Sequence, residues 1–492
     1  MMNWNLALSA LAAVTVVSMA AGFLGARKYA QQQYAGPIQD FVLASKGLER
    51  QSLIQLLLST SFSLNGMLYQ TWLGHKIGLW GLVVQAFWVA SFFWLAKYVD
   101  QVRGAPSLHA FLGQRFGTRT RVLAAACSVI GFSIFVGWEF NVGKSTFAGL
   151  LEPAGGLYDY LAWFMIATVF VSVLYTAVGG LAGDAIADLI QNIVKLSVYV
   201  LMAALLFIVA RNAGATDTIL PRLFPPLSAP IVELGILGFI TNIAFSALWQ
   251  FVDMSAWQSI IASKNRLDND GAKSALRLSG FAVFVAPGII GTLLGAFMLA
   301  SPEINADNIM ARLISTLPIT NPVFAFLVFV ALLATIMSVV DGIMLAASYS
   351  LVCDIIYRNE SLEDLDSDKS RSFKILAALR VALAAVAIIG SLGVMVLVER
   401  FGVSLFNITY VLIICQLALV GPVFYGLKNS VAAGDKMVWA IAFGLVIGLA
   451  SLVCSILSGQ EWLLTGAGLF TIIASYLSAA LFSRRASQRA SA

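Results

Sequence analysis

Residues Leu53–Leu73 read LIQLLLSTSFSLNGMLYQTWL, a stretch long enough to cross a bilayer as a helix, for which about 20 apolar residues suffice. Its centre, from Ser59 to Gly66, carries four hydroxyl side chains, an asparagine and a glycine. Polar groups at this depth are tolerated where the backbone is buried in protein or lines a wet cavity. The stretch is therefore either a broken helix at an ion and substrate site or a helix whose small polar residues bind a neighbouring helix.

The composition of the chain indicates an all-α polytopic membrane protein. Of its 492 residues, 60% are hydrophobic and 11% are charged, whereas a soluble domain carries roughly 25% charged residues. The net charge of +5 comes from basic residues spread over short loops. It therefore does not indicate nucleic-acid binding, and the lipid bilayer is the expected partner of this surface.

Motifs typical of enzymes are not apparent in the chain. The four cysteines lie in apolar stretches, and the two histidines are too few for a metal cluster. We found no nucleophile–base pair, no metal-ligand spacing and no phosphate-binding glycine loop. We therefore expect a protein that is not an enzyme, with no organic cofactor and no obligate protein partner.

Hydropathy predicts about thirteen membrane-spanning helices. Lysine and arginine are about four times as frequent in one set of loops as in the other, which predicts a multi-pass protein of the bacterial inner membrane with its N-terminus outside and its C-terminus inside. The predicted spans are 4–25, 51–74, 78–99, 121–148, 157–178, 184–210, 231–262, 275–300, 322–356, 375–398, 402–427, 436–458 and 461–483.

Several charged residues lie inside these spans. Asp184 and Asp188 are four residues apart, so they share one face of the sixth span, while Asp253 and Asp341 lie in the seventh and ninth. A carboxylate in the membrane costs several kcal/mol unless it is paired or hydrated, so each is a candidate functional group. For Asp341 a structural cap or salt bridge is the alternative, and for Asp184 a charge at an interfacial helix N-terminus.

The fourth span also carries opposite charges. Glu139 and Lys144 are five residues apart and do not stack well on one helix. Each is expected to find a partner on a neighbouring helix, and Lys195 is a candidate for Glu139. A structural ion pair and a role in coupling both fit this pattern.

The order of the interrupted spans predicts an inverted repeat. Leaving out the first span, the interrupted second span opens one group of five, and the interrupted seventh span opens the next. Two broken segments in corresponding places indicate a five-plus-five inverted-repeat transporter core, with one extra N-terminal and two extra C-terminal helices. The predicted segments are 1–50 (first helix and cytoplasmic loop), 51–212 and 213–430 (the repeats) and 431–492 (two helices and a basic tail).

The chain carries five motifs that resemble those of the sodium:solute symporter family, and they follow one another along the chain in the order found in that family. The family includes the proline, sialate, pantothenate and sodium/glucose symporters. The match runs over most of the chain, with Ala187 and Ser259 where the family usually has a threonine and an arginine. The motifs are Tyr175–Leu181 followed by Asp188 and Gln191, resembling YTxxGGLxxxxxTDxxQ; Asp40–Ala44; Leu112–Gly117, resembling LxxRFG; Gln258–Lys264, resembling QRxLAAK; and Ala334–Asp341, resembling AAxMSTLDS.

This resemblance implies a co-transported sodium ion where the first and eighth core helices meet. Carried over by motif, its ligands are the carbonyl groups of Phe62, Asn65 and Thr335 and the hydroxyl group of Ser338. Val339 stands where the family has a second hydroxyl, so Asp188, Asp341 or Asn65 are candidate replacements. Two neighbouring carboxylates can also share a proton, which leaves a proton-coupled or sodium-independent carrier as the alternative.

The resemblance also places a substrate pocket beside the ion. A neutral amide at Gln85 and the scarcity of basic residues there argue against a strongly charged ligand, and the aromatic residues fit either a cation–π site or ordinary packing. The expected function is sodium-coupled import of a small polar organic solute by alternating access, the other class being a membrane sensor with little net transport. The predicted lining residues are Asn65, Tyr69, Gln85, Trp88, Trp249, Gln250, Phe251 and Asn407.

Overall fold

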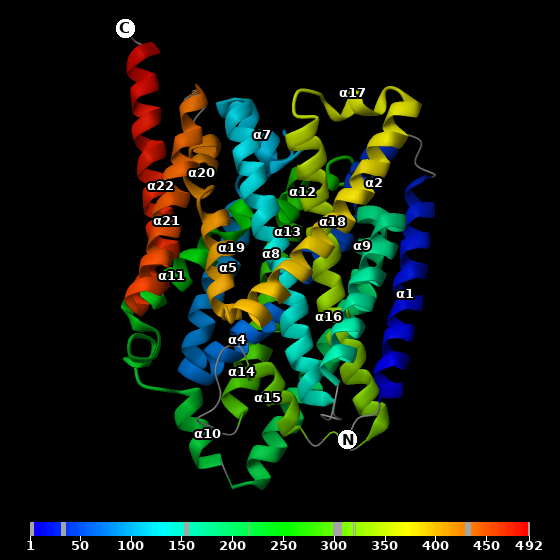
Figure 1. Cartoon of the computed structure of the whole chain (residues 1–492), viewed down its shortest axis with the longest axis vertical. Helices are drawn as coiled ribbons and strands as arrows, with labels where there is room; N and C mark the ends of the chain where they lie inside the picture. The colour runs from blue at the N-terminus through cyan, green and yellow to red at the C-terminus, as the bar shows by residue number, and fades with distance from the viewer. Residues whose placement is uncertain are drawn as a thin grey trace.

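The computed structural model describes residues 4–30, 36–151, 157–214, 216–298, 308–317, 319, 321–428 and 434–490. These residues form helices joined by short connections and no β-strand (Figure 1). An all-helical chain is what the apolar runs require, because a helix satisfies its backbone groups internally where lipid cannot. The predicted all-α class is confirmed.

Most helices are close to the predicted spans. The main elements are α1 (Trp4–Ala30), α2 (Pro37–Leu43), α3 (Arg50–Ser61), α4 (Leu64–Ile77), α5 (Gly81–Ala96), α7 (Leu108–Phe116), α8 (Thr118–Leu150), α9 (Leu157–Asn212), α11 (Ala229–Val252), α12 (Met254–Ala262), α13 (Asn269–Val283), α14 (Gly291–Phe297), α16 (Pro322–Tyr349), α18 (Lys369–Phe401), α19 (Leu405–Leu417), α20 (Val420–Lys428), α21 (Met437–Ser458) and α22 (Glu461–Ala490). The shorter elements are α6 (Val99–Val102), α10 (Thr216–Leu223), α15 (Ile309–Thr316), α17 (Leu362–Asp366), the π-helical segments η3 (Phe284–Ile290) and η4 (Ser350–Ile356), and the 3-10 turns η1 (Ala44–Lys46), η2 (Gly78–Trp80) and η5 (Gly434–Lys436).

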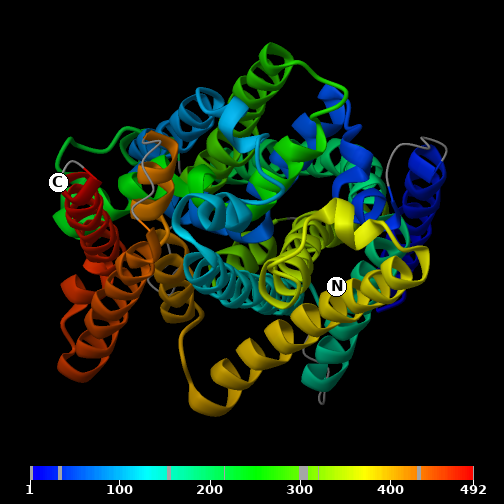
Figure 2. The ribbon, with the colours of Figure 1, turned by 90° about the horizontal axis from the view of Figure 1, so that it is seen from above.

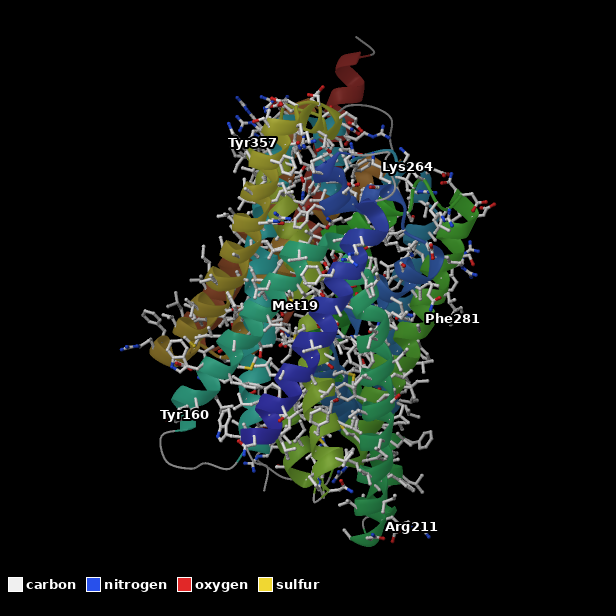
Figure 3. All side chains as sticks on the ribbon, turned by 90° about the vertical axis from the view of Figure 1, so that its right-hand side faces the viewer. Met19, Tyr160, Arg211, Lys264, Phe281 and Tyr357 are labelled. Carbon is white, nitrogen blue, oxygen red and sulfur yellow. The ribbon has the colours of Figure 1, made fainter. Side chains whose placement is uncertain are left out.

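Eleven stretches of the described residues are long and apolar enough to cross a membrane. Two of them fold back on themselves. Helix α9 bends at Gly180, whose φ of +52° is outside the helical range, and Figure 3 shows Tyr160 and Arg211 at the same end of the molecule. The stretch containing α4 and α5 turns at Gly78, with φ +54°. Each of the two turns divides one stretch into two helices. Eleven stretches with two such turns therefore agree with the predicted number of about thirteen crossings.

The first broken helix lies where the sequence predicted it. Helix α3 ends at Ser61, and Phe62 has φ −95° and ψ 54°. Ser63 is extended, and its hydroxyl group accepts a hydrogen bond from the Gly66 N–H at 2.7 Å. Ser63 is therefore the N-cap of α4, so the polar centre of the opening stretch serves to start a second half-helix in mid-membrane.

The second broken helix lies at Asp253, between α11 and α12. This residue has φ −78° and ψ 103°, and its carboxylate accepts hydrogen bonds from the N–H groups of Ser255 at 2.9 Å and Ala256 at 3.2 Å. Asp253 is thus an N-cap. The two breaks open the two predicted groups of five spans, as the inverted-repeat prediction requires.

The extra helices flank this core. Seen from above, α21 and α22 lie together at one side and α1 at the opposite side (Figure 2). Helix α1 packs on α9, and a Cβ atom on Gly25 would lie 2.4 Å from the Gly183 nitrogen. Small residues therefore let these two backbones approach closely, which is a common contact between membrane helices.

Candidate functional site

A cavity opens beside the first helix break. It encloses about 1110 Å³ of empty space, a figure that includes open solvent at its mouth. Its walls come from both broken helices and from α5, α8, α16, α19 and α22. The lining residues are Thr60, Ser61, Ser63, Asn65, Gly66, Leu68, Tyr69, Trp72, Trp88, Phe132, Phe135, Trp138, Thr241, Asn242, Phe245, Trp249, Asp253, Ser255, Ile343, Thr409, Tyr410, Leu412, Ile413 and Thr465.

Trp249 is surrounded by aromatic rings in this cavity. Trp88 stacks on it with ring centroids 5.9 Å apart and an interplanar angle of 24°. Phe245 and Phe132 contact it at 5.0 Å and 6.0 Å between centroids. Such rings offer flat apolar surfaces to a ligand at low conformational cost.

Two polar groups of the cavity lining have no hydrogen-bond partner in the described structure. They are the side-chain amide of Asn65, at both its nitrogen and its oxygen, and the hydroxyl group of Thr241. Both side chains are buried, Asn65 being 2% exposed. An unpaired buried polar group costs about 1–3 kcal/mol, so a ligand that binds these groups would recover that cost.

The neighbouring polar groups in the cavity are already paired. The Trp88 indole N–H donates to the Ser61 hydroxyl group at 3.3 Å, and the Tyr69 hydroxyl group donates to the side-chain oxygen of Asn242. The Asp253 carboxylate also accepts from the Ser255 hydroxyl group and from the Trp249 indole. Asn65 therefore keeps both a free donor and a free acceptor in this cavity, as the Thr241 hydroxyl group does.

Of the eight predicted substrate residues, four line the cavity: Asn65, Tyr69, Trp88 and Trp249. The other four lie outside its lining. Gln85 donates to the Val283 carbonyl group at 3.2 Å, and Phe251 packs on Phe424 with ring centroids 4.6 Å apart. Gln250 is buried and Asn407 is half-buried on α19. The neighbours of Trp249 in sequence thus point to other sides of α11.

Other lining residues were not among the predicted ones, although their spacing gives a signal. Thr241 and Phe245 precede Trp249 by eight and four residues, so all three share one face of α11. On α8, Phe132 and Phe135 are three residues apart and also face the cavity. Helical spacing counted from a known lining residue would have found them.

Two of the four predicted sodium ligands accept hydrogen bonds from a lysine. The Lys195 ammonium group, on α9, donates to the Phe62 carbonyl group at 3.2 Å and to the Ser338 hydroxyl group at 2.7 Å. The Ser338 hydroxyl group lies 3.4 Å from the Thr335 carbonyl oxygen, so Thr335 belongs to the same cluster. The Lys195 side chain is fully buried, and its nitrogen lies 5.0 Å from the centre of the Phe62 ring.

Glu139 binds the other side of the helix break. Its carboxylate accepts hydrogen bonds from the N–H groups of Leu64 at 2.6 Å and Asn65 at 3.2 Å. Glu139 and Lys195, the predicted partners, interact electrostatically, while each group binds the end of a different half-helix. Lys144 pairs with Glu399 on α18.

The two half-helix ends thus carry complementary charges. The C-terminal end of α3 faces the Lys195 ammonium group, and the N-terminal end of α4 faces the Glu139 carboxylate. A cation stabilises a helix C-terminus and an anion stabilises a helix N-terminus. Backbone dipoles that the break exposes in the membrane are therefore neutralised by side chains of the chain itself.

Three buried carboxylates lie close enough to interact electrostatically: Asp184, Asp188 and Asp341. Asp341 accepts hydrogen bonds from the Tyr175 hydroxyl group and, at 2.6 Å, from the Gly342 N–H. Asp184 is fully buried and lies one turn beyond the bend of α9, so it agrees with a charge at a helix N-terminus; the interfacial position of this helix end stays a prediction. No group of three metal-ligating side chains is found among the residues that the structure describes.

Two hydrogen bonds join the segment before α3 to α12, which leads toward the end of the molecule that carries Lys264 and Tyr357 (Figure 3). The side-chain amide of Gln258, on α12, donates to the Val42 carbonyl group at 2.6 Å. The Leu48 N–H donates to the Ala262 carbonyl group at 2.9 Å. These bonds join the segment that leads into α3 to the end of α12.

A second buried cluster lies at the same end. The Asp354 carboxylate, in η4, accepts two hydrogen bonds from Arg121 at 2.8 and 3.0 Å and one from Ser107 at 2.9 Å. It also lies 3.2 Å from a ring nitrogen of His109. This cluster joins η4 to α7 and α8.

No protein-family model matches the chain, and no curated protein sequence matches it. Solved structures, however, are similar to it in fold. A Na+-coupled sialic acid symporter in its substrate-bound, outward-open state superposes with a TM-score of 0.70 at 14% identity, covering 97% of both chains. Mhp1, a nucleobase-cation-symport-1 family transporter in a closed conformation with bromovinylhydantoin bound, gives 0.55 at 13% identity, covering 93% of this chain and 96% of that one.

These similarities define the class of fold. The chain has the LeuT fold, in which two sets of helices form an inverted repeat. The predicted all-α, inverted-repeat membrane architecture is confirmed, and the two helix breaks lie in corresponding places of its halves.

Proposed function

We propose that this protein is a secondary active transporter that carries a small organic solute through the aromatic cavity by alternating access. The observation that carries this proposal is the cavity beside the first helix break, with the unpaired amide of Asn65 in its wall. The similarity of the whole chain to two transporters with bound ligands supports the same proposal. The bonds between Gln258 and Val42 and between Leu48 and Ala262 would open when the site faces the other side.

The cavity favours a neutral, polar solute. Asp253 is the one charged residue in its lining, and four hydrogen bonds already occupy that carboxylate. A charged ligand would find no free counter-charge there, and burying an unpaired charge is costly. The Asn65 amide instead matches a solute with an acceptor beside a donor, such as an amide, a ureide or a polyol.

The coupling ion has two candidates. Sodium is the ion of the sialic acid symporter, and it remains a prediction for this chain with Phe62, Asn65, Thr335 and Ser338 as ligands and Asp188 or Asp341 as replacements for the missing hydroxyl. The contacts of Lys195 with Phe62 and Ser338 favour the second candidate, a proton-coupled or sodium-independent carrier.

The division of the chain also remains a proposal. Residues 51–212 and 213–430 would be the two repeats, residues 1–50 the first helix and its loop, and residues 431–492 the C-terminal helices with a basic tail; the boundary at 430/431 lies outside the described residues. The N-terminus would lie outside and the C-terminus inside a bacterial inner membrane, because of the distribution of lysine and arginine.

A binding screen followed by a flux assay tests the transporter proposal. Neutral amides, ureides and polyols are titrated into purified protein while tryptophan fluorescence is followed, since Trp88 and Trp249 line the cavity. Asn65→Leu should weaken binding of a ligand by about 5- to 150-fold, the equivalent of about 1–3 kcal/mol. Gln250→Leu is the matched control, because Gln250 is also a buried side-chain amide but lies outside the lining of the cavity.

The flux assay separates transport from sensing. A radiolabelled ligand should accumulate in proteoliposomes above its external concentration when an ion gradient is imposed. Equilibration without accumulation would indicate a channel, and binding without entry would indicate a sensor. Either of these outcomes would contradict the proposed function.

A further inference from the structure

We propose that a crevice between the first turns of α8 and α21 binds one anionic phospholipid. Arg119 and Lys436 hold its phosphate group, and one of its acyl chains lies on the apolar face of α21. The crevice shares no lining residue with the aromatic cavity, so this inference does not depend on the proposed transport function.

The lining of the crevice has a polar end and an apolar wall. The crevice encloses about 740 Å³ of empty space, a figure that includes open solvent. Arg119, Asp435 and Lys436 form the polar end, and the apolar wall includes Leu123 and Trp439. A phospholipid is amphipathic in the same way, whereas a soluble anion matches the polar end alone.

The crevice lies where two membrane-spanning helices enter the bilayer. Arg119 is the second residue of α8, and Lys436 directly precedes α21. Ala442, which also lines the crevice, follows Lys436 by six residues, or about 9 Å along a helix axis. The headgroup layer of one leaflet is about 5–8 Å thick. The basic side chains therefore lie at the depth of the lipid phosphate groups, and the apolar wall reaches the acyl chains.

The two basic side chains of the crevice are unpaired. Arg119 and Lys436 are exposed, and neither side chain forms an ion pair or a hydrogen bond with the residues that the structure describes. The Asp435 carboxylate lies against the start of α8, since a Cβ atom on Gly117 would collide with it, and the helix dipole favours an anion there. Two basic groups against one acidic group leave a net positive charge. A guanidinium group can bind two phosphate oxygens through parallel hydrogen bonds.

An apolar surface continues from the crevice along α21. It consists of Trp439, Phe443, Val446 and Ile447, which are all between 45% and 61% exposed. The last three follow Trp439 by four, seven and eight residues, so the four side chains share one helix face. Tryptophan is typical of the boundary between headgroups and acyl chains. An acyl chain whose phosphate group occupies the polar end would therefore cover this face.

Such a lipid would connect an accessory helix to the core. Figure 2 shows α21 and α22 at one side of the molecule, and η5, which precedes α21, packs on α7 and α8. The phosphate group would contact α8 through Arg119 and η5 through Lys436. Because the lipid binds only where these elements are folded together, it should raise the thermal unfolding midpoint.

The binding arm of the test titrates palmitoyl-oleoyl phosphatidylglycerol into the purified full-length protein in detergent. Native mass spectrometry counts the bound lipids, and the matching phosphatidylcholine is the probe without net charge. We expect the wild type to bind the anionic lipid more tightly. The double variant Arg119→Gln/Lys436→Gln should lose about 30-fold in affinity, since each basic residue near a membrane surface contributes about 5-fold.

The matched control for this arm is Lys264→Gln/Arg266→Gln. It removes two exposed basic residues that lie outside the crevice, so it should bind phosphatidylglycerol as the wild type does. An equal loss of affinity in this control would overturn the inference, because the attraction would then belong to the basic surface as a whole. Equal binding of the two lipids by the wild type would also overturn it.

The positional arm uses phosphatidylglycerol with brominated acyl chains, which quench nearby tryptophan fluorescence, at an equimolar ratio to protein. We expect the quenching to fall in Trp439→Phe but not in Trp462→Phe, which replaces an exposed tryptophan of α22. Unchanged quenching in Trp439→Phe would overturn the inference. Inorganic phosphate is the last probe and should not raise the unfolding midpoint. A rise equal to that given by phosphatidylglycerol, and lost in the double variant, would identify a soluble anion as the ligand and overturn the lipid assignment.

Discussion

Replacing Glu139 by glutamine tests whether a carboxylate holds the break between α3 and α4. The Glu139 side chain is fully buried, and its two oxygens accept from the N–H groups of Leu64 and Asn65. Hydrogen bonds to a charged group contribute about 1.5–3 kcal/mol each. A glutamine keeps one neutral acceptor for one N–H, but its amide nitrogen cannot accept from the other.

The expected magnitude follows from these bonds. One N–H at the start of α4 becomes unpaired at a cost of about 1–3 kcal/mol, and the remaining bond weakens by about 1 kcal/mol because the acceptor loses its charge. We expect Glu139→Gln to lower the free energy of unfolding by about 2–4 kcal/mol. Unfolding in mixed detergent micelles, followed by tryptophan fluorescence, measures this change.

Glu399→Gln is the matched control. Glu399 is 46% exposed and pairs with Lys144, and exposed ion pairs contribute about 0–1 kcal/mol. A Glu139→Gln variant within about 0.5 kcal/mol of the wild type, or no less stable than Glu399→Gln, would refute the assignment of Glu139 as the anion at the start of α4.

Three further predictions concern other contacts. Gly25→Leu should separate α1 from α9, because even a Cβ atom would lie 2.4 Å from the Gly183 nitrogen; a lower unfolding midpoint and a lower yield of folded protein would be measured. Gln258→Ala should remove the bond to the Val42 carbonyl group and, at about 1 kcal/mol per bond, shift the population open at this end about fivefold, measured by distances between spin labels placed on the two segments. Asp354→Asn should destabilise the fold by about 3–5 kcal/mol, since it leaves the charge of a paired Arg121 uncompensated, as measured by unfolding in detergent.

Each of these predictions has a control on the same chain. Gly393→Ala should be neutral or slightly stabilising, because nothing lies within 4 Å of its added Cβ atom. Gln250→Ala should leave the spin-label distances unchanged. Glu360→Gln removes the partner of a partly exposed Arg371 and should change the stability by less than about 1 kcal/mol. Equal effects of variant and control would contradict the corresponding prediction.

The helix breaks could be predicted because they leave a chemical signal in the sequence. Polar residues and glycine in the middle of an apolar run are costly unless the backbone leaves its helical pattern there, and this signal marked both Ser63 and Asp253. The fold follows from the same signal, because two breaks in corresponding halves define the inverted repeat.

The lining of the cavity was only partly predictable. Helix α5 and the end of α11 are apolar on nearly all sides, since one side faces protein and another faces lipid. Hydrophobic periodicity therefore does not say which side of the helix faces the cavity. Trp249 and its neighbour Gln250 differ by about 100° around the helix axis, so adjacent candidates could not both line the same cavity.

The position of Lys195 could not be predicted from the motifs. The motifs located the oxygens of Phe62 and Ser338, but they did not show which side chain of α9 reaches them. A lysine side chain is long and flexible, and its partner is chosen by the tertiary packing of three helices. Two lysines and five carboxylates inside the predicted spans were singled out from the sequence, and the structure was needed to show how these charged groups pair.

The backbone contact between α1 and the bend of α9 sets an order for assembly during synthesis. Gly25 emerges from the ribosome early, but its partner Gly183 follows about 160 residues later. At roughly 5–20 residues per second, α1 waits on the order of 10–30 s before this surface exists. During that interval the glycine face of α1 has no partner on α9, and it becomes a binding surface only when the second half of α9 has been inserted beside it.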